Sequence, residues 1–382
     1  MTTHIGQRRT CAAWIASLGI VLVAASASAQ IDGSHNQTQI TEFSVKGAGA
    51  GAGQGTIAVG EDAAGAIMGW YIDASNLSHG FLRDPDGRIT TIDVKGAGSG
   101  AFQGTSAYGM NLAGAITGVY SDANNVSHGF LRDPDGRITT IDVKGAGTGV
   151  GQGTFAGNIN PAGTIAGWYT DAGNVMHGFV RTPDGRITPF DVKGAGKGAA
   201  QGTFTTIYGS INHMGAITGN YIDASGASHI YVRDPDGWIT TFNGPGAGKG
   251  AGQGTFTEAI NSEGAITGYY VDAGNVMHGF LRDPDGRITT IDVKGAGTGA
   301  GQGTSPYDLN SAGKIVGVYI DASNVIHGFV LTPDGRFTTI DVKGAGTGAG
   351  QGTEIDTNNA AGDFVGDYID GSGVWHGFVG TP

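Results

Sequence analysis

The chain has 382 residues, of which 73 are glycine, 33 acidic and 21 basic, giving a net charge of −12. This balance argues against a nucleic-acid-binding protein, which needs a basic surface for phosphates, and against electrostatic docking on anionic membranes. A single cysteine excludes a disulfide-rich scaffold, and glycine does not recur at every third position as it does in collagen.

The first 29 residues have the pattern of a secretory signal peptide. Arg8 and Arg9 precede an apolar run over residues 12–25, and Ala27-Ser28-Ala29 supplies a small-residue cleavage site. We expect cleavage before Gln30, a short linker over residues 30–39, and a secreted or periplasmic protein without a membrane span in its mature chain. A retained membrane anchor is the alternative. Cleavage would also remove the single cysteine, Cys11.

The rest of the chain, residues 40–382, contains seven copies of a repeat of about 50 residues. Each copy has a Y-x-D triplet followed six residues later by a histidine, and six copies continue as H-G-F. Turn residues recur every 8–12 positions, which is typical of short β-strands. No segment has sustained helical periodicity.

The second copy illustrates the four strands that we expect in each repeat: Thr105–Met110, Ala115–Ser121, Ser127–Arg132 and Arg137–Val143. An N-x-x-G turn separates the first two strands, and an Asp-Pro-Asp-Gly turn separates the last two. Four antiparallel strands in each of seven repeats predict an all-β fold, a seven-bladed β-propeller.

The two ends of the array favour closure of a ring. Residues 40–45 match a fourth strand with no third strand before it, and residues 376–379 match a third strand with no fourth after it. We therefore expect the N-terminal strand to complete the last blade, which leaves no open sheet edge. A stacked β-solenoid is the alternative fold.

Glycine-rich segments such as residues 144–154 link successive repeats. They lack the G-x-x-x-x-G-K-[ST] pattern and the following helix of a phosphate-binding loop. A silk-like stack would need longer and less interrupted Gly-Ala runs. We interpret them as flexible connectors whose glycines reduce steric conflict with neighbouring backbone.

Aspartate–histidine pairs are the most regular polar feature. A histidine beside a carboxylate can form a metal site or an oriented base. Because the pair occurs in every copy, we interpret it as a structural hydrogen bond between the second and third strands. The pairs are Asp73 and His79, Asp122 and His128, Asp171 and His177, Asp223 and His229, Asp272 and His278, Asp321 and His327, and Asp370 and His376.

The D-P-D-G turns contain oxygen ligands of the kind that calcium prefers. Their spacing does not match a calcium-binding loop, and the first aspartate is Thr182 or Thr332 in two copies. We therefore interpret these segments as hairpin turns.

The fourth copy departs most from the others. It has a three-residue insertion within residues 205–212, and Trp238 stands where five other copies have arginine. An exposed tryptophan near a tyrosine and a histidine can stack on a sugar or an aromatic ligand. The candidate ligand-binding residues here are Trp238, Tyr208, His213 and Tyr231. Neutral drift in a loop is the alternative.

The first strands of copies five to seven carry further candidates, which would line the central channel of a propeller. Carboxylates converging there could bind a cation or a basic ligand, or act as an acid–base pair. Ordinary solvated strand ends are the alternative. These candidates are Glu258, Tyr307, Asp308, Glu354 and Asp356.

The H-G-F motif, with G-x-Y-x-D before it, resembles the HAF-type repeat of predicted extracellular bacterial proteins. His79-Gly80-Phe81 and five equivalents carry the resemblance, which covers residues 40–379, while the His229 copy departs from it. The resemblance implies export and a repeated β-architecture, and it implies no established activity. The P-D-G-R-I-T fragment is also similar to streptogramin lyase propellers, but their W-F-T-E-like element is missing.

We therefore expect an exported, non-catalytic propeller that binds a ligand, such as a glycan or cation, or a surface partner. No nucleophile–base arrangement, cofactor site or metal site is evident from the sequence. A secreted polysaccharide hydrolase or lyase that uses the channel carboxylates is one alternative. A structural protein of the envelope or matrix is another.

Overall fold

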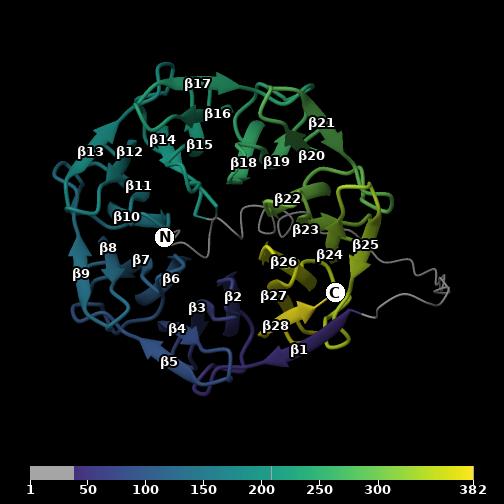
Figure 1. Ribbon diagram of the computed structural model, residues 1–382, viewed down its shortest axis with the longest axis horizontal. Helices are drawn as coiled ribbons and strands as arrows, with labels where there is room; N and C mark the ends of the chain where they lie inside the picture. The colour runs from purple at the N-terminus through teal and green to yellow at the C-terminus, as the bar shows by residue number, and fades with distance from the viewer. Residues whose placement is uncertain (1–37, 208, 382) are drawn as a thin grey trace.

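The computed structural model describes residues 38–207 and 209–381, and this part of the chain is all-β (Figure 1). The signal peptide and most of the linker expected from the sequence lie outside the described residues, as does Tyr208. The 28 strands fall into sets of four that follow the sequence repeat. No helix that could span a membrane occurs in residues 38–207 and 209–381.

The strands of each set are named here by their order within the repeat. The first strands are β2 (Gly55–Glu61), β6 (Gly104–Met110), β10 (Gly153–Ile159), β14 (Gly202–Thr205), β18 (Gly254–Ile260), β22 (Gly303–Leu309) and β26 (Gly352–Asn358). The second strands are β3 (Ile67–Ile72), β7 (Ile116–Ser121), β11 (Ile165–Thr170), β15 (Ile217–Ile222), β19 (Ile266–Val271), β23 (Ile315–Ile320) and β27 (Phe364–Ile369).

The third strands are β4 (Ser78–Arg83), β8 (Ser127–Arg132), β12 (Met176–Arg181), β16 (Ser228–Arg233), β20 (Met277–Arg282), β24 (Ile326–Leu331) and β28 (Trp375–Thr381). The fourth strands are β5 (Ile89–Ile92), β9 (Ile138–Ile141), β13 (Ile187–Phe190), β17 (Ile239–Phe242), β21 (Ile288–Ile291), β25 (Phe337–Ile340) and β1 (Gln39–Phe43).

Each set is an antiparallel meander in which consecutive strands pair. In the first set β2 pairs with β3, β3 with β4, and β4 with β5. In six of the sets a β-bulge interrupts the first strand, for example between Ala58 and Gly60, and changes the direction of the side chains that follow it. The turns provide the positive backbone angles that tight hairpins need, as at Gly87 (φ 88°) of the Asp-Pro-Asp-Gly turn.

The two ends of the described chain close the ring. β1 pairs antiparallel with β28, with Phe43 opposite Gly377 and Gln39 opposite Thr381. A parallel bridge between Gly55 and Trp375 joins β2 to β28, just as the bridge between Gly104 and Ser78 joins β6 to β4. Figure 1 shows β1 beside β28 on the circumference of the ring. The expectation of a closed all-β fold is confirmed, and the solenoid alternative is wrong.

The glycine-rich connectors are held by specific hydrogen bonds. Val45 N donates to Thr56 Oγ1 at 2.9 Å, and equivalent bonds occur at all seven connectors. Gln54 accepts from Gly51 N at 2.9 Å and donates to Asn76 Oδ1 at 3.0 Å. A Cβ atom added to Gly49 would lie 2.8 Å from the Asp73 carbonyl carbon. Close approach of backbone therefore explains the glycines, and a hydrogen-bonded connector replaces the flexible one that we expected.

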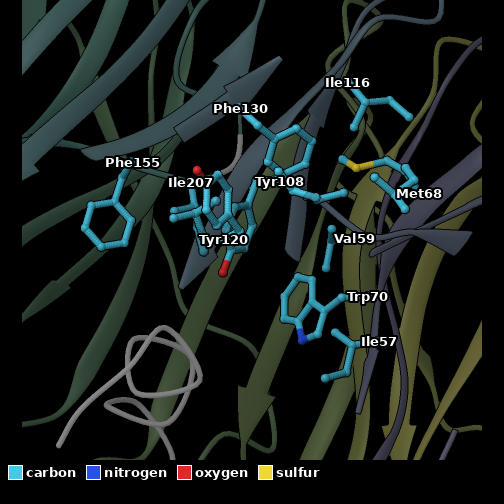
Figure 2. Packing of buried hydrophobic residues seen from close by; sticks show 14 of the residues in the cluster. Ile57, Val59, Met68, Trp70, Tyr108, Ile116, Tyr120, Phe130, Phe155 and Ile207 are labelled. Carbon is cyan, nitrogen blue, oxygen red and sulfur yellow. The ribbon is translucent and has the colours of Figure 1, made fainter. Parts of the chain in front are cut away.

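The hydrophobic core lies between adjacent sets. Trp70 of β3 packs edge-on against Tyr108 of β6 with ring centroids 5.2 Å apart, and both side chains are buried (Figure 2). Phe155 of β10 stacks on Trp168 of β11 at 4.8 Å within the same cluster. Full burial of one such side chain stabilises a fold by roughly 1.5–3 kcal/mol, so the contacts between sets contribute to the stability of the ring.

Candidate functional site

The ring has two faces with different polar chemistry. The connector face carries the connectors and the turns between second and third strands, such as residues 73–77, which are hydrogen-bonded to each other through Gln54. The turn face carries the turns between first and second strands and those between third and fourth strands. These two kinds of turn are neighbours in the first repeat, where a Cβ atom added to Gly65 would lie 4.0 Å from Pro85 Cβ.

On the connector face, every repeat places its histidine beside the turn aspartate, and five repeats add a second carboxylate on the other side of the imidazole ring. His79 Nδ1 lies 2.8 Å from Asp93 Oδ1 of the segment after β5, and His79 Nε2 lies 3.6 Å from Asp73 Oδ2. The imidazole stacks on Tyr71 with ring centroids 4.8 Å apart. Asp73 Oδ1 also accepts hydrogen bonds from the backbone N–H groups of Ser75 and Leu77, which fixes the turn.

The same arrangement recurs around the ring. The distance from histidine Nε2 to the turn aspartate ranges from 3.1 Å at His229 to 3.9 Å at His128. Five repeats provide the second carboxylate, from Asp93, Asp142, Asp191, Asp292 and Asp341. The fourth repeat has Asn243 instead, 2.9 Å from His229 Nδ1, and the seventh has Ser44 at the equivalent position.

A neutral imidazole has one N–H group, and ionised carboxylates only accept hydrogen bonds, so two flanking carboxylates favour the charged imidazolium. Burial opposes the charge of His327, but the hydrogen bond and charge of Asp341 and the charge of Asp321 outweigh it, so its pKa is raised. Burial alone would raise the pKa of Asp223. Hydrogen bonds from Ser225, His229 and Ala227 outweigh this effect, and the pKa falls to about 2.

In the first six repeats, these contacts make the histidine a cross-link among three consecutive segments of the repeat. The sequence indicated the pair between the turn aspartate and the histidine, but it did not identify the second aspartate. That residue lies 14 positions after the histidine, and its regular recurrence in the I-D-V segment was the pattern that could have revealed it.

On the turn face, asparagines of the N-x-x-G turns link neighbouring repeats. Asn111 Oδ1 accepts from Ala115 N at 3.0 Å, and Asn111 Nδ2 donates to the Asn160 carbonyl at 3.3 Å. Equivalent bonds run from turn to turn through Asn160, Asn212, Asn261, Asn310 and Asn359. We call this series the asparagine ring.

The asparagine ring changes character where the seventh repeat meets the first. Asn359 Nδ2 donates to Glu61 Oε2 at 3.2 Å, and Asp62 occupies the position that is asparagine in the other copies. Burial raises the pKa of Glu61 to about 7, with a further contribution from the charges of Asp363 and Asp62.

The Asp-Pro-Asp-Gly segments form the hairpin turns that the sequence predicts. In the second repeat Asp133 N donates to the Arg137 carbonyl and Gly136 N donates to the Asp133 carbonyl, both at 2.8 Å. In residues 38–207 and 209–381, no group of three or more histidine, cysteine or acidic side chains is arranged to hold a metal ion.

The fourth repeat brings two of its candidate residues to the turn face. Trp238 is 77% exposed and lies in the turn between β16 and β17. His213 and Met214 are exposed in the neighbouring turn, whose Gly215 lies against Pro235.

Tyr231 does not belong to this surface. It is 0% exposed, and its ring lies over Gly219 in the core position that phenylalanine fills in the other repeats. Our expectation that Tyr231 contacts a ligand is therefore wrong, because the tyrosine keeps the buried orientation of the residue it replaces. Tyr208, the fourth candidate, lies outside the described residues.

Most of the candidate residues on the first strands are buried or bonded to other residues of the chain. Glu354 and Asp356 are 6% and 1% exposed, so the expectation of accessible channel carboxylates is wrong for both. Asp308 Oδ2 accepts from Thr357 Oγ1 at 2.8 Å and from Asn358 N at 2.9 Å, which joins β22 to β26. Burial raises the pKa of Asp308 although these bonds oppose the shift. Glu258 and Tyr307 are partly buried on β18 and β22.

Comparison with known proteins gives a fold but no family. No family model matches the chain, and no curated protein is similar to it. Among solved structures, the chain is similar to the BP39L lectin from Burkholderia pseudomallei, with 11% identity and a TM-score of 0.52 over 81% of this chain and 93% of that one.

Two other solved structures are less similar. A structure from a study of two prolyl endopeptidases has a TM-score of 0.49 at 12% identity, covering 82% of this chain and 46% of that chain, so the match spans about half of its length. The Aleuria aurantia lectin, described as a six-bladed β-propeller, has a TM-score of 0.39 at 12% identity over 73% and 92% of the two chains. The strand pairing thus shows a closed all-β fold, and the fold of the BP39L lectin is similar to it.

Proposed function

We propose that this protein is an exported, non-catalytic, seven-bladed β-propeller that binds carbohydrate, with each four-stranded set forming one blade. The four-strand pairing in each repeat and the pairing of β1 with β28 support the blade assignment. The lectin from Burkholderia pseudomallei, which has a similar fold, supports a binding role for such a ring.

The exposed indole of Trp238 is the observation that carries this proposal. Its turn is ordered, because Trp238 N donates to Asp234 Oδ1 at 2.8 Å and Asp234 N donates to the Trp238 carbonyl at 2.9 Å. An aromatic ring that is open to solvent on such a turn offers a flat apolar surface for the C–H face of a sugar ring. The other polar features that recur around the ring already have intramolecular partners.

The buried carboxylates weigh against the alternative of a polysaccharide hydrolase or lyase. A general acid and a general base must both reach the substrate. Glu354 and Asp356 are nearly inaccessible, and Asp308 binds two groups of the neighbouring set.

Export is supported by the signal-peptide pattern of residues 1–29 and by the resemblance to HAF-type repeats. Expression of the full chain in a bacterial host, followed by mass measurement of the protein recovered outside the cytoplasm, would test it. We expect a mature chain that starts at Gln30. An uncleaved chain in the membrane fraction would contradict export.

Binding is tested by a glycan array on the mature protein, followed by calorimetric titration with the best glycans. Trp238→Ala should weaken binding at least about tenfold, since a central aromatic contact contributes about 2 kcal/mol or more. Arg137→Ala is the matched control, because Arg137 occupies the equivalent turn position in the second repeat and is similarly exposed, at 76%. An array with no binding, or Trp238→Ala binding like the unaltered protein, would contradict the proposal.

A further inference from the structure

We propose that the Trp238 site selects saccharides that carry a free, protonated amino group. This inference rests on the proposed carbohydrate-binding function and adds the chemical class of the ligand. It comes from comparing one turn of the fourth repeat with the same turn elsewhere in the ring.

In the other repeats, this turn contains an arginine that can neutralise its aspartates. Arg137 Nε and Nη2 both donate to Asp133 Oδ2, at 3.0 and 2.8 Å. In the sixth repeat, Arg336 Nε lies 2.9 Å from Asp334 Oδ2. In the second and sixth repeats, one carboxylate of the turn therefore already has a cationic partner within the chain.

The fourth repeat keeps the carboxylates and replaces the cation with an aromatic ring. The backbone bond is retained, since Trp238 N donates to Asp234 Oδ1 just as Arg287 N donates to Asp283 Oδ1 in the fifth repeat. Counting residues 133–137 gives two aspartates and one arginine, a formal charge of −1. Counting residues 234–238 gives two aspartates and no arginine, a formal charge of −2.

The nearby Arg233 does not take the place of the missing arginine. Its guanidinium stacks over Phe190 at 5.3 Å from the ring centroid, and its Nη1 donates to the Asp234 carbonyl at 3.2 Å. The equivalent Arg83 and Arg282 also stack on aromatic rings, of Phe43 and Phe242, so this contact belongs to the blade.

A solvent-exposed indole with unneutralised carboxylates beside it favours a ligand that is apolar on one face and cationic at one substituent. An ammonium group can interact with the indole face and form charge-assisted hydrogen bonds with the aspartates. An N-acetylated sugar keeps only the stacking and neutral hydrogen bonds. A uronic acid would be repelled by Asp234 and Asp236.

Calorimetric titration of the mature protein at about pH 6.5, where an amino group of this kind is protonated, would test the selectivity. The probes are tetramers of glucosamine, N-acetylglucosamine and galacturonic acid. We expect the glucosamine tetramer to bind at least about fivefold more tightly than the acetylated one, and the galacturonate tetramer to bind most weakly.

Three variants locate the effect. Asp234→Asn together with Asp236→Asn should remove the preference for the amine while the acetylated tetramer still binds, because asparagine retains an oxygen that can accept from Trp238 N. Trp238→Arg, which restores the turn of the other repeats, should abolish binding of all three. Arg137→Trp should create a second site and raise the stoichiometry from one to two.

The outcomes separate the two proposals. Equal affinity for the amine and its acetylated form, or a preference that survives removal of both carboxylates, overturns the amine selectivity while leaving carbohydrate binding in place. If no saccharide on the array or among these probes binds, both proposals are wrong.

Discussion

The connector face and the turn face differ in how strictly they repeat. On the connector face, histidine, tyrosine and the turn aspartate form nearly the same cluster in every set. On the turn face, the asparagine ring changes at Glu61, and arginine gives way to Trp238 in the fourth repeat. In this molecule, polar residues that recur act as cross-links, and residues that break the repeat are the candidates for binding.

The largest expected difference between the faces concerns two glycines with positive φ angles. Gly104 on the connector face (φ 103°) would place a Cβ atom onto the Ser78 carbonyl oxygen, whereas the equivalent atom on Gly114 of the turn face (φ 80°) would lie 3.9 Å from Pro134. Gly104→Ala should destabilise the fold by about 4 kcal/mol or prevent folding, and Gly114→Ala by only about 1–2 kcal/mol. Urea denaturation of both variants measures this; equal losses would contradict the difference between the faces.

A smaller expected effect is a pH dependence of the free energy of unfolding that comes from Glu61 on the turn face. Because the pKa of Glu61 is raised from 4.5 to about 7 in the folded state, the fold prefers its neutral form. The stability linked to Glu61 is therefore complete below about pH 4.5 and is lost as pH rises through about 7.

We expect the free energy of unfolding to fall by about 1–2 kcal/mol between pH 5 and pH 8, allowing for solvent screening of a partly exposed group. Glu61→Gln should flatten this slope in urea denaturation at several pH values. A slope that is unchanged in the variant would show that another group titrates.

His327 should give a weaker pH dependence of stability in the same direction. The pKa of His327 is raised, so its stabilising contribution is complete below the unfolded pKa near 6.5 and decreases as pH rises through the folded value. At pH 5, His327→Ala should cost about 1–2 kcal/mol, and His376→Ala, whose repeat has Ser44 instead of a second aspartate, should cost less. The two losses should converge at pH 8; the same gap at both pH values would argue against an imidazolium cross-link.

The smallest expected effect is a gain in stability. Asp62→Asn would restore the residue of the other copies, with an amide donor for the Asn111 carbonyl and one less charge near Glu61. This change should stabilise the protein by about 0.5–1 kcal/mol, measured by thermal unfolding. A lower melting temperature would mean that Asp62 has a role the asparagine ring does not explain.

Much of the fold could be predicted from the sequence because the turn residues that separate the strands can be recognised locally. The third strand, expected over Ser127–Arg132, has those bounds in the structure, and the second, expected over Ala115–Ser121, begins one residue later. The fourth strand is shorter than expected, at Ile138–Ile141, because the chain leaves the sheet at Asp142 to reach the connector. Closure of the ring could be predicted because residues 40–45 match a fourth strand without a third, and residues 376–379 match a third strand without a fourth.

The site was harder to predict because exposure depends on packing. Tyr231 replaces a phenylalanine that covers a glycine in the other repeats. The position is buried, so the tyrosine is buried although its hydroxyl group is polar. Asp356 sits in the β-bulge of β26, between Ile355 and Thr357, where simple alternation of side chains fails. Trp238 could be identified because it lies in a turn, where a large side chain has little neighbouring structure to cover it.

The pairing of β1 with β28 has a consequence for biogenesis. Of the described strands, β1 precedes all the others in the chain, yet its partner is β28, since Phe43 pairs with Gly377 and Gln39 with Thr381. Until β28 has been made, β1 lacks its partner strand, so closure is a late step that joins the first and last of the described strands. A nascent or truncated chain that lacks residues 375–381 would present an open edge, and open edges of this kind are where chains aggregate.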